Sequence, residues 1–343
     1  MTGPSGKPTR IAVFGAGSIG GWIGGRLAAH AQVRLIGRPA VRDELARHGL
    51  RLTAWDGWQR QLAPGEVDFA TGAEAAADAD LVLVTVKSAA TARAAGELAP
   101  HLRRGTPVLS FQNGLRNPQV LAEGLPGCTV LAGMVPYNVV RAGPGHLHQG
   151  TSGQLMAQSH PALRAFLPLF AAAGLPLQLR RDMAAVQAGK LLLNLNNALN
   201  ALAGIPLREE LSQRAWRRCL ALAQAEALRV YRAAGIRPAR VTPLPPAWLP
   251  ALLRLPDALF TRLAARMLRI DPLARSSMWE DLQAGRPTEV DWIQGEIVQL
   301  GARHGVPTPV NARLVQLVHD AERARRHWTG TELLADLQAA SGR

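Results

Sequence analysis

The feature that most constrains the fold of this 343-residue chain is a glycine pattern near its N-terminus. The motif Gly15-Ala16-Gly17-Ser18-Ile19-Gly20 directly follows an apolar run at residues 11–14 and opens a stretch with the composition of a helix. In such a strand–turn–helix unit, the glycines permit the tight turn, the approach of a pyrophosphate and close packing of helix on strand. Amides at the helix N-terminus then bind phosphates. The motif predicts a dinucleotide site, with a flexible glycine loop as the alternative.

Short apolar runs alternate with alanine-rich stretches through the first half of the chain. We expect buried strands at residues 11–14, 32–36, 81–86 and 108–111, and helices at 18–30, 40–48, 89–99 and 117–123. This alternation indicates a parallel sheet with helices on both faces. Four more short strands are expected to extend the sheet, at 128–134, 137–140, 145–148 and 153–156. A helix at 160–173 and a strand at 176–180 would close this domain.

Beyond residue 182 the pattern is almost wholly helical. We expect helices at 182–203, 208–234, 257–268, 273–284, 289–304 and 309–325, with a proline-rich break at 238–250. The predicted fold class is therefore α/β plus all-α: a Rossmann-type doubly wound sheet at 10–181, followed by a helical domain at 182–343. Residues 1–9 are expected to form a mobile tail. An exposed apolar helix face in the second domain would support a homodimer.

The formal net charge of +14 suggests nucleic-acid binding as one hypothesis. The basic residues are scattered, however, and no aromatic residues are interleaved with them as stacking platforms, so we favour a solvated surface that attracts anionic metabolites. No segment reaches the roughly 18 apolar residues of a membrane span, and Cys128 and Cys219 match no metal-binding spacing. We expect a cytoplasmic protein without nucleic-acid, membrane or metal partners.

The end of the second predicted strand indicates which dinucleotide is bound. An enzyme that uses NAD usually places an acid there, to accept hydrogen bonds from the ribose 2′-hydroxyl. This chain has Arg38 instead, and a guanidinium can pair with the 2′-phosphate of NADPH. The sequence thus favours NADPH over NADH, with an ordinary surface arginine as the alternative.

Lysine is rare in this chain, and two of its positions suggest chemistry. The 39 basic residues include only Lys7, Lys87 and Lys190 as lysines. A desolvated lysine can exchange its proton near neutral pH, whereas an arginine cannot. Lys87 follows the strand at 81–86, and Asn113 follows the strand at 108–111. Both therefore fall at the sheet edge where ligands bind in open α/β sheets.

Lys190 begins a run that contains four asparagines among apolar residues. At about 100° per residue on a helix, Lys190, Asn194 and Asn197 fall within roughly 60° of one another. They therefore share a face. We interpret this face as a substrate-binding cluster, with a buried polar seam between helices as the alternative.

At these residues the chain resembles the ketopantoate reductase family, the 2-dehydropantoate 2-reductases, over nearly its full length. The matching elements are the glycine motif, Val86-Lys87, Asn113-Gly114, Gly189-Lys190 with Asn194, Ser276-Ser277-Met278, and Thr288-Glu289-Val290-Asp291. The resemblance implies NADPH-dependent reduction of the keto group of a small 2-oxo acid, ketopantoate, to give pantoate for pantothenate biosynthesis.

The resemblance also implies that residues 182–343 form the substrate and catalytic domain, and it implies roles for individual residues. Lys190 would be the proton donor, and Glu289 would orient the lysine, the cofactor or the substrate. Asn113 and Asn194 would hold substrate oxygens, and Ser277 would contact the substrate carboxylate. The cofactor would be bound by Gly15, Ala16, Gly17, Ser18, Ile19, Gly20, Arg38, Lys87, Asn113 and Glu289.

One position departs from the family pattern. The second helix asparagine, expected eight residues after the lysine, is Ala198 here, and Asn197 precedes it. A shift of one residue rotates the amide by about 100° around the helix. Since that asparagine helps recognise the hydroxyl end of ketopantoate in the family, two alternatives stay open: a reductase of another small 2-oxo acid, and an NADPH-sensing protein without turnover.

Overall fold

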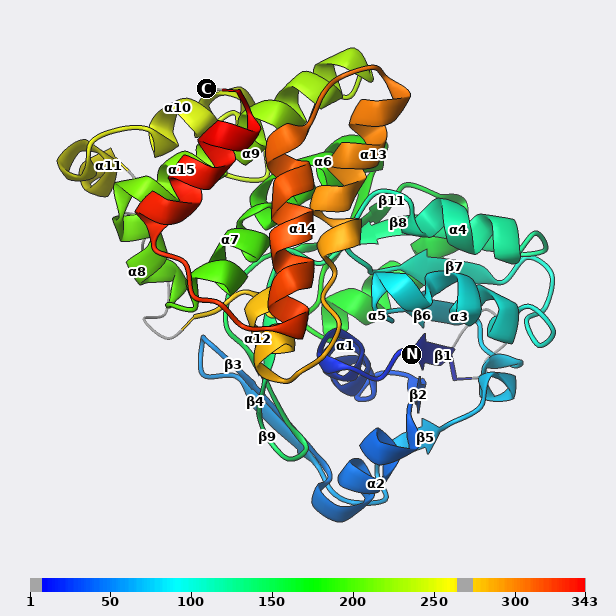
Figure 1. Cartoon of the computed structure of the whole chain (residues 1–343). Helices are drawn as coiled ribbons and strands as arrows, with labels where there is room; N and C mark the ends of the chain where they lie inside the picture. The colour runs from blue at the N-terminus through cyan, green and yellow to red at the C-terminus, as the bar shows by residue number, and fades with distance from the viewer. Residues whose placement is uncertain (1–7, 264–273, 343) are drawn as a thin grey trace. The chain divides into compact units, whose positions relative to one another are not determined.

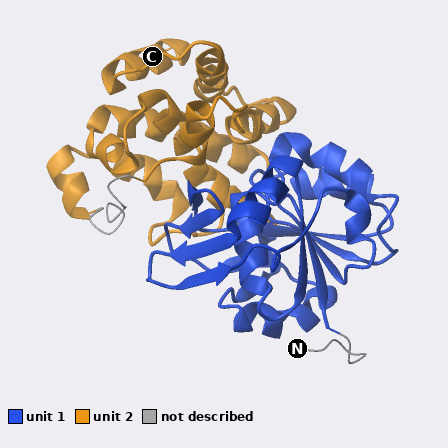
Figure 2. Ribbon diagram, turned by 90° about the horizontal axis from the view of Figure 1, so that it is seen from below, with its two compact units in different colours: residues 1–183 blue, residues 184–343 orange. Residues whose placement is uncertain are grey.

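The structure is a computed structural model that describes residues 8–263 and 274–342. It divides into two compact units, Met1–Met183 and Ala184–Arg343, which Figure 2 distinguishes by colour. Residues 1–7, which form most of the predicted tail, lie outside the described part. Thr9 already pairs with the neighbouring strand, because its carbonyl accepts a hydrogen bond from the Gln32 amide at 2.9 Å.

The first unit is built on an eight-stranded sheet in the order β12-β11-β8-β7-β6-β1-β2-β5. Its strands are β1 (Arg10–Phe14), β2 (Gln32–Ile36), β5 (Asp68–Ala70), β6 (Leu81–Val84), β7 (Pro107–Ser110), β8 (Thr129–Met134), β11 (Leu155–Gln158) and β12 (Leu177–Arg180). The six strands from β5 to β8 in this order are parallel, and β11 pairs antiparallel with β8. The predicted parallel sheet is therefore confirmed.

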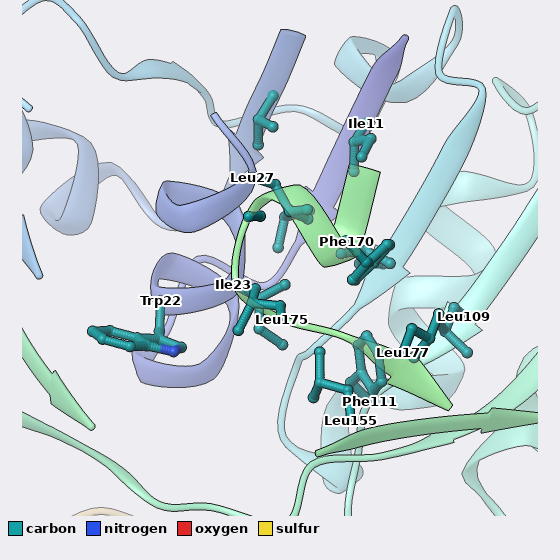
Figure 3. Packing of buried hydrophobic residues seen from close by; sticks show 14 of the residues in the cluster. Ile11, Trp22, Ile23, Leu27, Leu109, Phe111, Leu155, Phe170, Leu175 and Leu177 are labelled. Atoms are coloured by element: carbon teal, nitrogen blue, oxygen red, sulfur yellow. The ribbon is translucent and has the colours of Figure 1, made fainter. Parts of the chain in front are cut away.

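Side chains of β1 alternate between two apolar layers, as a strand buried on both faces requires. Ile11 and Val13 join a cluster that contains residues of α1 (Ser18–Leu27) and α5 (Leu167–Ala172), drawn in Figure 3. Ala12 and Phe14 join a second cluster with residues of α3 (Thr91–Leu98) and α4 (Asn117–Gly124). Helices thus cover both faces of the sheet and leave its strand ends for loops.

Two of the strands expected to extend this sheet do not do so. β9 (Val139–Gly143) and β10 (His146–Gln149) belong to a separate sheet with β3 (Leu50–Ala54) and β4 (Gln59–Leu62), in the order β4-β3-β10-β9. The prediction was wrong because β3 and β10 alternate between buried and more exposed positions, so only one of their faces is apolar. That face contributes Leu50, Leu52 and Leu147 to the cluster shared with α1. α2 (Pro39–His48) lies between β2 and β3 in the chain.

The second unit is helical, as expected (Figure 1). Its helices are α6 (Met183–Asn194), α7 (Asn196–Ala203), α8 (Leu207–Ser212), α9 (Arg214–Ala233), α10 (Leu249–Leu253), α11 (Asp257–Leu263), α12 (Ser277–Gln283), α13 (Gln294–Arg303), α14 (Pro309–Arg323) and α15 (Gly330–Ala340). The predicted helices at 182–203 and 208–234 are each split in two, and α15 had not been predicted. Parts of the helices expected at 257–268 and 273–284 lie outside the described residues. Among those described, no helix is long and apolar enough to span a membrane.

Candidate functional site

The glycine loop joins β1 to α1 in the conformation that the motif requires. Gly15 has φ +111°, and a Cβ there would lie 2.6 Å from the Val86 amide nitrogen. At Gly20 a Cβ would lie 2.3 Å from the Gly15 carbonyl oxygen, so the loop packs directly on the start of α1. At Gly17, the residue before α1, a Cβ would have no neighbour within 4 Å. The middle glycine therefore faces open space at a helix N-terminus, where a phosphate can approach.

Arg38 lies beside this loop, just beyond the end of β2. The amides of Gly15 and Ala16 donate to the Ile36 carbonyl at 2.9 and 3.0 Å, which fixes the loop against the strand end that leads to Arg38. Arg38 is exposed at the start of α2, and its side chain does not cap that helix. The loop and the strand end that precedes Arg38 are thus brought together, and no acid stands between the loop and Arg38 in the chain.

Lys87 and Asn113 follow β6 and β7, which are neighbouring parallel strands. Lys87 is exposed and Asn113 is half-buried. The Ser88 hydroxyl donates to the Asn113 carbonyl at 3.4 Å, so the two loops are in contact. Gly114 has φ +85° and turns the chain into α4. The structure therefore brings these two predicted residues to one edge of the sheet.

A buried polar network holds these loops, and the sequence did not reveal it. The Gln112 amide nitrogen donates to the Val86 carbonyl at 3.0 Å and to the Thr91 hydroxyl at 2.7 Å. The Asn117 amide nitrogen donates to the Asn113 carbonyl, and its oxygen lies 2.7 Å from the Thr91 hydroxyl. Because these polar groups are buried and hydrogen-bonded to one another, they fix both loop backbones.

In the second unit, Lys190 lies in the second half of α6. The preceding residue explains how this helix is positioned: a Cβ at Gly189 would lie 2.4 Å from the Ala239 carbonyl oxygen. The Ala239 amide in turn donates to the Ala185 carbonyl at 2.7 Å, so residues from the proline-rich break pack closely along α6. Burial among protein atoms lowers the pKa of Lys190 to about 8, because the charged ammonium loses water.

The asparagines after Lys190 fall into two sets. Asn194 and Asn197 are half-buried. Asn196 is 9% exposed and Asn200 is fully buried, so both of these belong to the interior. The helix is interrupted at Leu195, whose carbonyl accepts a hydrogen bond from the buried Gln294 amide at 2.7 Å. Asn196 and Asn200 therefore fit the alternative of a buried polar seam, and a substrate-facing role for Asn194 and Asn197 stays a prediction.

The two remaining predicted site residues lie at the starts of short helical segments. Ser277 is the exposed first residue of α12, and its neighbour Ser276 ties that end to α7, because the Ser276 hydroxyl donates to the Asn197 carbonyl at 3.2 Å. Glu289 is half-buried and precedes a 3-10 turn at Val290–Trp292. The adjacent Thr288 amide donates to a Glu322 carboxylate oxygen at 2.8 Å, which anchors this loop to α14. No group of three or more potential metal ligands occurs among the described residues.

A glycine loop on a parallel sheet, followed by a helical unit that carries a low-pKa lysine, is the architecture of a class of pyridine-nucleotide-dependent oxidoreductases. The family model described as "Ketopantoate reductase PanE/ApbA" matches residues 11–162, and its C-terminal counterpart matches residues 182–322. The chain therefore belongs to the ketopantoate reductase family.

Individual relatives agree with this assignment. The chain is 31% identical over 322 residues to the 2-dehydropantoate 2-reductase of Halobacterium salinarum, a match that covers 92% of this chain and 99% of the relative. A crystal structure of a ketopantoate reductase of this family from Ralstonia eutropha JMP134 superposes with a TM-score of 0.79 at 30% identity, covering 93% of this chain and all of that one. D-mandelate dehydrogenase with NADH and anilino(oxo)acetate, at 21% identity and a TM-score of 0.77 over 92% of this chain and 99% of its own, shares the fold.

Proposed function

We propose that this chain reduces 2-dehydropantoate, or a closely related 2-oxo acid, to the 2-hydroxy acid with NADPH. The observation that carries the proposal is Lys190, a lysine whose pKa is lowered to about 8 on a helix that also presents Asn194. Such a group is mostly protonated at neutral pH and still gives up its proton readily, as a general acid must.

The residues of the first unit fit a phosphorylated dinucleotide. The open space at Gly17 and the amides at the start of α1 would receive the pyrophosphate, and the exposed Arg38 would pair with the 2′-phosphate. Lys87 and Asn113, on loops in contact with each other, would hold the cofactor from the sheet edge. When bound, the cofactor supplies the hydride that reduces the keto carbon.

Within the second unit, the α6 residues would act on the keto acid. Lys190 Nζ would first polarise the keto oxygen and then deliver a proton to it as negative charge develops there. The amide of Asn194, one helical turn further on, would accept from and donate to oxygens of the substrate. Ser277 would contact the substrate carboxylate, and Glu289 would orient the lysine, cofactor or substrate.

The test is the oxidation of NADPH, followed by absorbance, with 2-dehydropantoate and a panel of other 2-oxo acids. We expect Lys190→Ala to lose on the order of a hundredfold or more in kcat. Lys190→Arg is the matched variant, because it keeps the charge and loses the tunable proton, and we expect it to be similarly impaired. If NADPH binds and no 2-oxo acid is reduced, the proposal fails and a sensing role becomes the better explanation.

Cofactor choice has its own test. We expect Arg38→Ala to raise the KM for NADPH about tenfold or more while it leaves the KM for NADH nearly unchanged, since only NADPH carries the 2′-phosphate. Arg42 on α2 provides a matched control, because it already pairs with Asp43 at 2.8 Å. Equal effects of Arg38→Ala on both cofactors would contradict the assignment.

A further inference from the structure

The helical unit contains a cavity whose lining includes Asn197 and none of the residues to which the proposed reduction is assigned, namely Lys190, Asn194, Ser277 and Glu289. It has a volume of about 230 Å³ and is lined by residues from α6 to α11. Most of the lining is leucine side chains, together with Phe260 of α11. A cavity of roughly 150 Å³ lined by such residues accommodates benzene, so this one has room for a two-ring molecule.

One arginine connects the helices that form the cavity wall. Arg217 of α9 is fully buried, and its guanidinium donates to the carbonyls of Leu211, Leu253 and Leu255 at 2.9 to 3.3 Å and to the Asp257 carboxylate at 2.7 Å. These acceptors belong to α8, to α10 and its end, and to the start of α11, which are three of the helices that line the cavity. Specific hydrogen bonds therefore join the ends of the wall helices through Arg217 and fix the positions of these helices around the cavity.

Two amide oxygens without a partner identify what the cavity would bind. Gln224 is 2% exposed, and its nitrogen donates to the Leu192 carbonyl at 3.1 Å, where the break at Leu195 leaves that carbonyl available. A carbonyl accepts hydrogen bonds only from a donor, so the Gln224 nitrogen must face the Leu192 carbonyl. The Gln224 oxygen then has no hydrogen-bond partner among the described residues. Asn196, which is 9% exposed, also lies on the lining, and its amide oxygen likewise has no hydrogen-bond partner among the described residues.

The lining contains no charged side chain among the described residues, since the charge of Arg217 lies behind the wall and is paired with Asp257. A buried acceptor that lacks a donor is costly, and a donor supplied by a ligand removes that cost. Three of the lining side chains are only half-buried, so the cavity is open to solvent on their side: Leu207, Leu211 and Leu252.

We propose that this cavity is a binding site for a small neutral molecule with an apolar body of about two rings and a hydroxyl or N–H group that donates to Gln224. The proposal does not depend on the reductase activity. It differs from a packing defect, which would accept any apolar molecule of suitable size, and from a water-filled pocket, which would accept none.

The experiment compares indole, which has an N–H donor, with indene, which has the same shape and no donor. Calorimetric titration of the full chain should show indole bound at one site at least tenfold more tightly than indene, because only indole can satisfy the Gln224 oxygen. Absence of indole binding, or equal binding of the two compounds, would overturn the proposal.

Variants locate the site. Leu252→Trp, which fills the cavity from its half-buried edge, should lower indole affinity at least tenfold, whereas Leu259→Trp on the exposed side of α11 should leave it unchanged. Gln224→Met, which retains the volume and removes the acceptor, should abolish the preference for indole over indene. This ratio of affinities does not depend on overall stability, so a persistent preference in Gln224→Met would refute the assigned role of the glutamine.

Discussion

Glu210 is an acid that the fold should hold uncharged at neutral pH. It is fully buried on α8, and one carboxylate oxygen accepts a hydrogen bond from the Asn200 amide at 2.6 Å. Burial raises the pKa of Glu210 from 4.5 to about 8, and the amides of Asn200 and Asn196 offset only part of this effect. A difference between these two values corresponds to a cost of about 5 kcal/mol for ionising the carboxyl in the folded state.

The sign of the effect on stability follows from proton binding. Between pH 4.5 and 8 the folded state keeps a proton that the unfolded state has released, so this group lowers the free energy of unfolding as the pH rises. The slope approaches about 1.4 kcal/mol per pH unit. Glu210→Gln has no ionisable group at this position, so its stability relative to the wild type should increase steadily from pH 5 to pH 8.

Urea unfolding at pH 5, 6, 7 and 8, followed by tryptophan fluorescence, measures this difference. Glu209→Gln is the matched control, because Glu209 is the adjacent residue on α8 and is exposed. For the control, the difference from the wild type should remain constant within about 0.5 kcal/mol. If the stability difference for Glu210→Gln is the same at every pH, or shrinks as the pH rises, the reasoning on Glu210 is refuted.

Three further predictions, made with four variants, test other parts of the structure by urea unfolding and ligand titration. Gly20→Ala should lower the free energy of unfolding by about 2 kcal/mol or more, because its Cβ would collide with backbone. Gly17→Ala should lower it by less than about 1 kcal/mol and weaken NADPH binding tenfold or more, because a Cβ there meets no protein atom. Equal losses of stability in the two variants would contradict this difference. Arg217→Met should lower the free energy of unfolding by about 2–3 kcal/mol, since it leaves the carbonyls of Leu211, Leu253 and Leu255 without their donor. A loss below about 1 kcal/mol would contradict a structural role for these hydrogen bonds. Asn117→Ala should lower the free energy of unfolding by about 2–3 kcal/mol and, because the Asn113 loop loses a hydrogen bond, raise the KM for NADPH or the 2-oxo acid. An unchanged KM would show that the network has a structural role only.

The parts of the fold that were predicted correctly are those in which local sequence and burial agree. β1, β6 and β7 are short runs of apolar residues buried on both faces, and the glycine motif follows the first of them. The second sheet was not recognised because its strands carry their apolar residues on one face only. β4 reads Gln-Arg-Gln-Leu and becomes a strand through its antiparallel pairing with β3. Pairing between segments distant in the chain has no local signal.

The candidate site was predicted in the same uneven way. Lys190 was selected from composition, because lysine is rare in this chain, and Arg38 from its place after a strand; both stay predictions as site residues. The buried polar residues that fix neighbouring loops and helices could not be predicted. Gln112 and Asn117 resemble ordinary polar loop residues until the structure shows them buried and bonded to neighbouring loops. Gln224, Glu210 and Arg217 lie on helices whose polar residues would normally face solvent, and only tertiary packing reveals their burial.

Burial distinguishes Ala198 from Asn197, the asparagine that precedes it. Ala198 is fully buried, so an amide at that position would be enclosed by protein and would need partners, as the buried Asn200 finds in Glu210, the Ile205 carbonyl and the Ser276 amide. Asn197 instead is half-buried and lines the cavity beside Leu193. The resemblance implies that an amide at position 198 would recognise the hydroxyl end of the substrate, and in this chain the amide of Asn197 lies next to an apolar wall instead. The carbonyl chemistry assigned to Lys190 does not require this change, so the side chain of the 2-oxo acid is the property in which this chain is expected to depart from its relatives.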